Sequence, residues 1–224
     1  MNNFLFVVST ALVLVPSAAA AFALLSNVLA TRHVNGGGDA CALPAGVSYA
    51  LNTPFALGDI SSLGYMKFKP DLCGHVVTID CSHGSLDILI TNSNYGGGMD
   101  LYSQVTWPTA TANAAPGQVY CTAQLTSKNP LTGASNQCFY KPGTGTTNAY
   151  YRNVGILNTG GKIVKGATVG GAAGSHAGDN PYYAFNLGRA INVTEIVTFT
   201  FDDGTTYSTP FSSCVDKGSE QLFQ

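Results

Sequence analysis

Short apolar segments alternate with glycine, asparagine and proline along this chain, and runs of the helix formers Glu, Lys and Leu are nearly absent. Such segments, rich in β-branched and aromatic residues, are typical of strands. We expect strands in the first half at residues 75–79, 86–91 and 118–125. We expect strands in the second half at residues 150–157, 162–169, 182–187, 195–201 and 205–208. Asp202-Asp203-Gly204 between the last two is a hairpin turn signal. The pattern predicts an all-β protein, with a short helix starting at 104–107 and ended by Pro108.

The composition shifts near residues 141–149, where large apolar side chains are almost absent until Tyr150. Such a segment is typical of a linker. We therefore place a first domain at 41–141 and a second at 146–215. Five strands in about 70 residues suit a small β-sandwich.

The first 30 residues carry no charged side chain. An apolar run over 4–15 is followed by Pro16 and small residues, a pattern typical of a secretory signal peptide with cleavage after Ala20 or Ala30. We assign residues 1–30 to this peptide. A membrane anchor is the alternative, because 4–30 is long enough to span a bilayer, but Pro16 and the polar Ser26-Asn27 pair disfavour it. We expect a secreted protein with no membrane association after cleavage.

Charged residues make up 10% of the chain and the net charge is −2, which excludes a basic nucleic-acid-binding surface. Six cysteines in an exported chain predict three disulfides, with fifteen pairings open. Metal ligation is disfavoured because no Cys-x-x-Cys motif occurs. Asn192-Val-Thr194 is an N-glycosylation sequon. The cysteines are Cys41, Cys73, Cys81, Cys121, Cys138 and Cys214.

Two ordered sets of motifs resemble one known family. Cys73-Gly74, Val77-Thr78, Thr91-Asn92, the turn at 96–98 and Asp100-Leu101 follow the order found in the double-psi β-barrels of expansins, loosenins and barwin-like proteins. Tyr150-Tyr151, Gly160–Ile163, Tyr182–Phe185 and Asp203-Gly204 resemble the second expansin domain, a family-63 carbohydrate-binding module. The resemblance covers most of the mature chain. It implies a six-stranded double-psi β-barrel followed by a small immunoglobulin-like β-sandwich.

Asp100 is the first candidate for chemistry. From the sequence alone it is equally a helix N-cap, but the resemblance implies a place in an open polysaccharide groove. Hydrolysis would need a second carboxylate roughly 5 to 10 Å away. The resemblance places Asn92 where many bacterial expansins have Asp, and an amide cannot act as a base. Asp87 is expected on the opposite strand face by alternation, and Asp80 on a turn, so a non-hydrolytic groove is predicted.

Aromatic residues are the second set of candidates. Tyr95, in the glycine-rich turn, is expected to be exposed, and Trp107 is expected in the core. The resemblance implies a sugar-stacking platform of Tyr150, Tyr151 and Tyr182, although adjacent strand residues point to opposite faces. Lys162 and Lys165 would line the same face as ordinary solvent-exposed charges, and His176 is expected in a loop. His33 would bind copper only if cleavage after Arg32 made it the N-terminus.

These observations predict a secreted, monomeric, expansin-like protein that binds and loosens cell-wall polysaccharide without hydrolysis. The polymer is cellulose, xylan, chitin or peptidoglycan, and no cofactor is expected. Met99 departs from the His-Phe-Asp arrangement that plant expansins often have, and this departure argues against full expansin activity. One alternative is a glycosidase of the family-45 type, which would release sugar. Another is a barwin-like defence, effector or protease-inhibitor protein, since a fold does not fix function.

Overall fold

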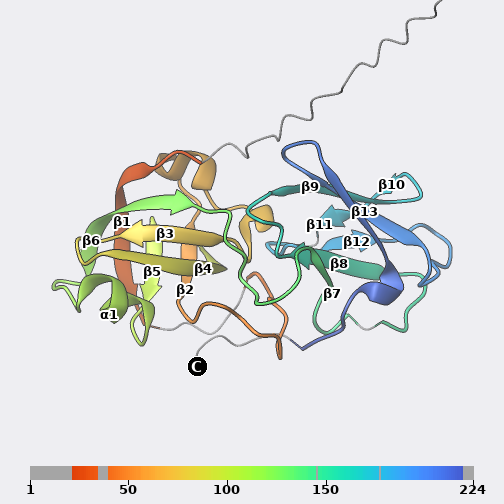
Figure 1. Cartoon of the computed structure of the whole chain (residues 1–224), viewed down its shortest axis with the longest axis horizontal. Helices are drawn as coiled ribbons and strands as arrows, with labels where there is room; N and C mark the ends of the chain where they lie inside the picture. The colour runs from red at the N-terminus through yellow and green to blue at the C-terminus, as the bar shows by residue number, and fades with distance from the viewer. Residues whose placement is uncertain (1–21, 35–39, 145, 177, 219–224) are drawn as a thin grey trace, which may run out of the picture.

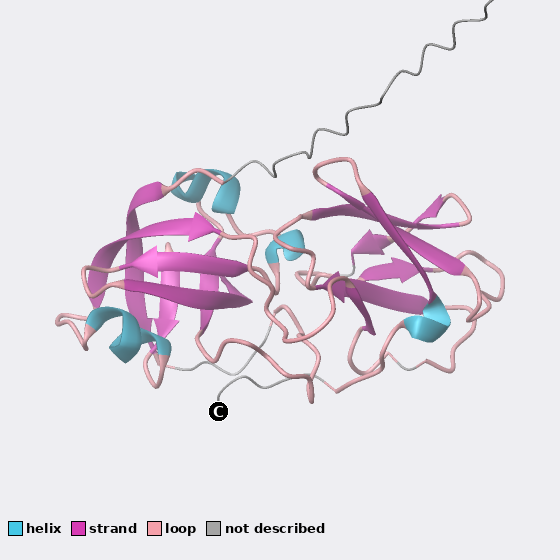
Figure 2. Ribbon diagram, viewed as in Figure 1, coloured by secondary structure: helices cyan, strands magenta, loops and turns pink. Residues whose placement is uncertain are grey.

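The computed structural model describes residues 22–34, 40–144, 146–176 and 178–218 as two β domains side by side. Figure 1 shows the first domain on the left and the second on the right. The helices are short and fall in the connections between strands (Figure 2). The all-β prediction is confirmed.

The first domain is a closed six-stranded barrel with the order β1-β5-β2-β4-β3-β6. The pairs β1–β5 and β2–β4 are parallel and the other pairs are antiparallel. Alternate side chains point into the barrel and form one apolar core. The elements are β1 (Leu25–His33), β2 (Pro54–Gly58), η1 (Ser61–Met66), η2 (Pro70–Leu72), β3 (Val76–Asp80), β4 (Ser85–Asn94), β5 (Met99–Tyr102), α1 (Thr106–Thr111) and β6 (Gln118–Leu125).

The second domain is a sandwich of two four-stranded sheets, with orders β10-β9-β13-β14 and β11-β12-β8-β7. The predicted hairpin turn is confirmed, with Gly204 at a positive φ between β13 and β14. The elements are β7 (Gln137–Tyr140), β8 (Arg152–Leu157), β9 (Val164–Val169), β10 (Ala172–Ala173), β11 (Ser175–His176), β12 (Tyr183–Phe185), β13 (Ile196–Phe201), β14 (Thr206–Pro210) and η3 (Phe211–Ser213).

The expected domain boundaries need correction at both ends of the barrel. β1 belongs to the barrel, although its residues precede the range 41–141 and largely fall in the segment assigned to the signal peptide. Ala30 is fully buried in this strand, so cleavage after Ala30 would remove most of β1. Residues 1–21, with the predicted site after Ala20, lie outside the described residues. The apolar alternation of β1 resembled the end of a leader because both are runs of small and aliphatic residues.

The second boundary lies before β7, which pairs with β8 and so belongs to the sandwich. The segment at 141–149, expected as the linker, is instead a connection between these two strands. Pro108 lies inside α1 and does not end it, because a helix leaves its first N–H groups without intrahelical partners and tolerates proline there.

The three predicted disulfides are present, and the structure decides their pairing. Cys41 is joined to Cys73, Cys81 to Cys121 and Cys138 to Cys214. Within the described part of the chain, no helix is long and apolar enough to cross a bilayer.

Candidate functional site

Asp100 points outward from the middle of β5, because its neighbours Met99 and Leu101 are fully buried inside the barrel. It pairs with Thr31 of β1 on one side and with Ala56 of β2 on the other. Ala56 pairs in turn with Asn92 of β4. Cross-strand partners project from the same side of a sheet. These four outward residues therefore form a row across four strands, which we call the Asp100 face.

The carboxylate of Asp100 is held by its neighbours on β1. The Thr31 hydroxyl donates a hydrogen bond to Oδ1, and the His33 Nδ1 atom lies 3.7 Å from Oδ2. Asp100 is therefore a strand residue, and the alternative interpretation as a helix N-cap is wrong; Val105 precedes α1 in that position. The positions of Thr31 and His33 beside Asp100 were not predicted from the sequence, because they depend on the pairing of β1 with β5.

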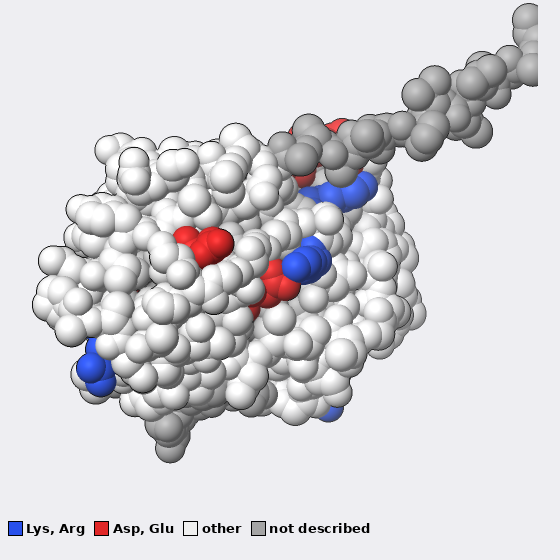
Figure 3. Space-filling model, turned by 60° about the vertical axis from the view of Figure 1, so that its left-hand side comes forward, with Lys and Arg blue, Asp and Glu red and all other residues white. Residues whose placement is uncertain are grey.

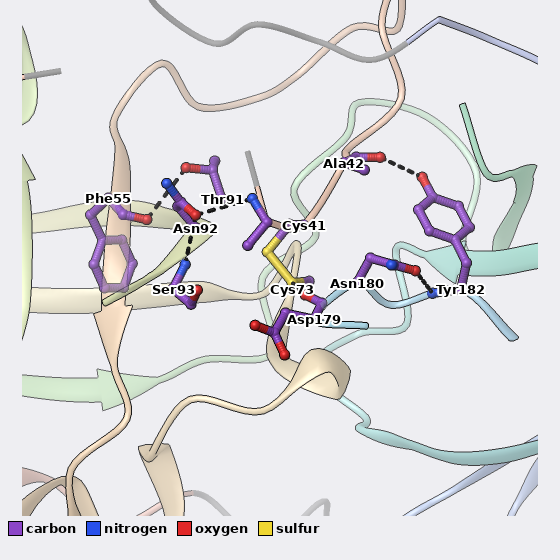
Figure 4. Close-up of a disulfide and its surroundings, with 11 residues drawn as sticks. Cys41, Ala42, Phe55, Cys73, Thr91, Asn92, Ser93, Asp179, Asn180 and Tyr182 are labelled. Atoms are coloured by element: carbon purple, nitrogen blue, oxygen red, sulfur yellow. Dashed lines mark hydrogen bonds between the residues drawn. A yellow bond between two sulfur atoms is a disulfide. The ribbon is translucent and has the colours of Figure 1, made fainter. Parts of the chain in front are cut away.

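Asn92 ends the row beside the Cys41–Cys73 disulfide (Figure 4). Its Oδ1 atom accepts hydrogen bonds from the backbone N–H groups of Ala40 and Ser93, at 3.0 and 2.9 Å. Two strand spacings of about 4.8 Å place its Cα roughly 10 Å from that of Asp100. The residue between them in the register is Ala56, which is buried. Asp100 and Asn92 thus lie two strands apart in this row, with Asn92 at one end and Thr31 at the other.

A β-bulge in β4 corrects the expected position of Asp87. The register with β2 shifts between Phe55/Ile90 and Ala56/Asn92, so alternation along β4 is interrupted there. Asp87 pairs with Thr78 and points outward, and it lies on the same surface of the barrel as Asn92. It is still about 16 Å away, at five residues of about 3.3 Å each.

The carboxylate of Asp87 already has partners, since it accepts hydrogen bonds from Lys128 and Thr78. Burial raises the pKa of Asp87, but these two partners outweigh burial and leave the pKa below its usual value. Asp80, the other candidate donor, was expected on a turn but is the last residue of β3, and it accepts a hydrogen bond from the Ser82 N–H. Neither residue supplies a second carboxylate to the Asp100 face.

The glycine-rich turn at 96–98 lies tightly over β2. A Cβ atom added to Gly58 would stand 1.8 Å from the Gly97 carbonyl oxygen, and one added to Gly98 would stand 2.1 Å from the Leu29 oxygen. These close contacts are backbone contacts that cannot move aside as a flexible side chain can. Glycine at both positions lets the turn sit beside Asp100.

We expect Gly58→Ala to destabilise the barrel by about 1 to 3 kcal/mol, because overpacking against backbone forces the turn outward. Gly96→Ala is the matched control in the same turn, since an added Cβ there meets nothing within 4 Å. Urea unfolding monitored by circular dichroism compares the two. Equal stability of Gly58→Ala and Gly96→Ala would contradict the close packing described.

Tyr95 is exposed, as expected, with 80% of its surface accessible. Its hydroxyl donates a 3.1 Å hydrogen bond to Oδ2 of Asp179, which belongs to the second domain. This bond raises the pKa of Tyr95. The ring therefore extends from the turn beside the Asp100 face towards the domain boundary. Trp107 is fully buried, as expected.

Tyr182 cannot serve in an exposed platform, because only 2% of its surface is accessible. Its ring packs on Gly155, and its hydroxyl donates a 2.9 Å hydrogen bond to the Ala42 carbonyl of the first domain (Figure 4). It belongs to the same buried cluster as the barrel core. The prediction of a three-tyrosine row is therefore wrong, since the barrel covers the sheet at Tyr182.

Tyr150 and Tyr151 remain accessible. They lie in the turn before β8, with Tyr150 62% exposed and Tyr151 half-buried. Asn153 donates a hydrogen bond to the Tyr151 hydroxyl, at 3.4 Å. Leu157, at the other end of β8, packs into the cluster shared with the barrel. The strand is about 20 Å long, so the two tyrosines lie at the end of the sandwich remote from the barrel.

Comparison with models of protein families finds no match, and neither does comparison with curated protein sequences. Similar solved structures include two of one protein. One is the apo expansin of Clavibacter michiganensis, with a TM-score of 0.61 and 14% identity over 88% of this chain and 94% of that one. The other is a mutant of the same expansin in complex with cellohexaose, with a TM-score of 0.59 and 13% identity over 90% and 99% of the two chains. This chain has the two-domain expansin fold. The expected double-psi barrel followed by a β-sandwich is thereby confirmed.

In this expansin fold the two domains are joined by partly buried polar contacts as well as by apolar packing. Asp71 of the barrel accepts a 2.8 Å hydrogen bond from Nε2 of His176 and a 3.2 Å hydrogen bond from the Tyr183 hydroxyl. The rings of His176 and Tyr183 are 4.1 Å apart. His176, expected as a loop residue, therefore lies on β11 and pairs with the barrel.

The Asp71–His176 pair predicts a pH-dependent domain contact. Burial lowers the pKa of His176, but the hydrogen bond and charge of Asp71 outweigh it, so that pKa lies above 6.5. Burial raises the pKa of Asp71, but the bonds from His176 and Tyr183 leave it below 3.8. The histidine contribution is complete below its unfolded pKa and is lost as pH rises through the raised value. The aspartate contribution is present above its unfolded pKa and is lost as pH falls through the lowered value.

Stability should therefore be greatest between about pH 4 and 6.5. His176→Gln should remove about 1 kcal/mol in that window and flatten the decline above it. Chemical denaturation across pH tests this, with His83→Gln as the matched control because His83 is exposed. An unchanged pH profile in His176→Gln would contradict the assignment.

The two lysines considered for the face of the tyrosine platform lie in the second domain. Lys162 contacts Asp203 and Thr205, each at 2.9 Å, and Lys165 is exposed on β9. A copper site at an N-terminal His33 is excluded by the fold, because cleavage after Arg32 would remove nearly all of β1. On the face shown in Figure 3, charged side chains are few and uncharged residues cover most of the surface.

Proposed function

We propose that this protein is secreted and binds cell-wall polysaccharide of the cellulose type, which it loosens without hydrolysis. The single observation that carries the proposal is the row across the barrel, in which the carboxylate of Asp100 and the amide of Asn92 lie two strands apart and no second carboxylate is present. The expansin fold supports it, since one solved structure of that fold is a complex with cellohexaose.

A carboxylate in this setting can bind sugar hydroxyls. Thr31 holds one oxygen of Asp100, and the other oxygen lies towards His33. Both oxygens of a carboxylate have further lone pairs for sugar O–H donors. The Oδ1 atom of Asn92 already accepts hydrogen bonds from Ala40 and Ser93, so the acceptors that this row offers to sugar are those of Asp100. These groups replace hydrogen bonds between neighbouring polymer chains, which is what loosening requires.

Hydrolysis by the general acid and base route would need a second carboxylate about 5 to 10 Å from the first. Besides Asp87, the other described carboxylate to consider is that of Asp59, which follows the end of β2. Its Cα lies three residues beyond that of Ala56, at a distance of about 10 Å. Its Oδ1 atom is ion-paired with Lys67 at 3.0 Å. An ion-paired carboxylate beyond the glycine-rich turn is poorly placed to activate water at the Asp100 face.

The test combines binding and sugar release in one tube. The protein is incubated with insoluble cellulose, xylan or chitin, and the bound fraction, the mechanical strength of the polymer and the soluble reducing sugar are measured. We expect binding and weakening without sugar above background. Asp100→Asn should weaken binding roughly tenfold or less, because one charged hydrogen-bond acceptor becomes neutral.

Steady sugar release that Asp100→Asn abolishes would instead support the family-45 type of glycosidase. Asp59→Asn is the matched control for that outcome, because it would share the loss only if Asp59 acted as the base. Failure to bind any of the polymers would contradict the proposal and favour a barwin-like interaction protein.

A further inference from the structure

We propose that His33 is a sugar-binding residue, and that its Nδ1 atom and the Oδ2 atom of Asp100 together hold one sugar hydroxyl. The inference rests on the proposed function, and it adds to Asp100 the residue that selects a free hydroxyl at this position. His33 is the last residue of β1, and 47% of its side chain is accessible.

The two oxygens of the Asp100 carboxylate have different surroundings. Oδ1 accepts the hydrogen bond from Thr31, and a Cβ atom added to Gly97 would stand 3.8 Å from it. This oxygen therefore lies between β1 and the glycine-rich turn. Oδ2 faces His33 instead, 3.7 Å from Nδ1. Only 14% of the Asp100 side chain is accessible, so a sugar reaches the carboxylate most directly from the side of the half-exposed histidine.

The separation of His33 from Asp100 suits a shared ligand atom. A distance of 3.7 Å between Nδ1 and Oδ2 is too long for a direct hydrogen bond, whose heavy atoms are about 2.7 to 3.2 Å apart. Polar groups at such a distance are commonly bridged by one oxygen atom. An oxygen about 2.8 Å from Oδ2 and about 2.9 Å from Nδ1 can contact both, because these two lengths together exceed the separation.

The pair offers one acceptor and one donor. An ionised carboxylate only accepts hydrogen bonds, whereas an imidazole N–H donates. The negative charge at Oδ2 favours a proton on the ring nitrogen that faces it, so we assign Nδ1–H as the donor. A hydroxyl group donates and accepts at once and so matches both partners. An ether or carbonyl oxygen only accepts, and it would face Oδ2 without a proton.

The strand β5 holds His33 in this place before any sugar binds. His33 pairs with Tyr102 in the parallel register of β1 with β5, and their ring centroids are 6.4 Å apart. The Ser103 N–H donates a 2.9 Å hydrogen bond to the His33 carbonyl. Thr31 pairs with Asp100 in the same register, so one strand pairing brings both residues of β1 to the carboxylate. A side chain that is already placed costs less entropy when a ligand binds.

The experiment is a double-mutant cycle on the full chain. Affinity is measured for cellohexaose by calorimetry and for insoluble cellulose by depletion. His33→Phe keeps a ring but removes the N–H, and it should weaken binding about five- to tenfold. His33→Gln retains an N–H donor and should lose less. His83→Phe is the matched control, because His83 is an exposed histidine of the same barrel, and it should bind as the wild type does.

The combined variant tests the shared hydroxyl. Asp100→Asn together with His33→Phe should weaken binding by clearly less than the product of the two single effects, because both side chains hold the same group. Losses that multiply would show that the two side chains act on separate groups and would overturn the inference. Equal coupling of the two replacements in urea unfolding of the sugar-free protein would show a direct pair between the side chains, which also overturns it.

The cycle separates this inference from the proposed function. A wild type that binds cellulose, together with a His33→Phe variant of equal affinity, overturns the role of His33 while polysaccharide binding stands. If the wild type binds neither cellohexaose nor any of the polymers, the proposed function fails and this inference fails with it.

Discussion

Tyr182→Ala should lower the free energy of unfolding by about 3 to 5 kcal/mol, the range for removing a large aromatic side chain from a packed core. The ring lies between Gly155 and the barrel and is 2% exposed. Truncation would leave a cavity at the domain boundary and an unsatisfied Ala42 carbonyl. Thermal or urea unfolding measures the loss, and amide hydrogen exchange shows whether it is concentrated where the two domains meet.

Two variants make this result specific. Tyr182→Phe removes only the hydrogen bond to Ala42 and should cost about 1 kcal/mol. Tyr150→Ala, which truncates a 62% exposed ring, should change stability by less than about 0.5 kcal/mol. A Tyr182→Ala protein that is as stable as the wild type but no longer binds polysaccharide would restore the platform interpretation.

Removal of the Cys138–Cys214 disulfide by a double replacement with alanine should destabilise the sandwich strongly. The bridge closes a separation of 76 residues, for which the chain-entropy relation gives about 4.5 kcal/mol. The bridge also holds the segment after η3 against β7. The Val215 N–H bonds to the Cys138 carbonyl at 2.9 Å, and the Tyr140 N–H bonds to the Val215 carbonyl at 2.9 Å.

The Cys81–Cys121 bridge is the matched comparison, because it joins β3 and β6 within the barrel across a separation of 40 residues. Its removal should cost slightly less, about 4 kcal/mol by the same relation, and should act on the barrel. Hydrogen exchange followed by mass spectrometry localises each effect. Sandwich amides that stay as protected without Cys138–Cys214 as in the wild type would show that the bridge is dispensable.

Several local features of this protein could be predicted because they depend on neighbouring residues. Each expected strand overlaps an observed one, since β-branched alternation is a local property. The turn at Gly204 followed from residues that favour positive φ. The strands β2 and β5 were missed because they are short and adjoin glycine- or asparagine-rich segments.

The candidate site was likewise predicted only in part from the sequence. The lack of a carboxylate at Asn92 was legible in the sequence, but the reason given for excluding Asp87 was wrong, because a bulge changes the alternation of β4. A bulge depends on pairing with β2, which is remote in the chain. Thr31 and His33 join Asp100 only through the parallel pairing of β1 with β5.

The sequence by itself determined that this is an all-β protein with an even set of cysteines and a lone aspartate after a glycine-rich turn. These properties reside in composition, spacing and local turn chemistry. Only the tertiary structure decided that β1 closes the barrel and that Tyr182 is buried. The physical reason is that exposure and register depend on which distant segment covers a residue. The Tyr182 side chain is buried because the segment at Ala42, 140 residues away in sequence, packs over it.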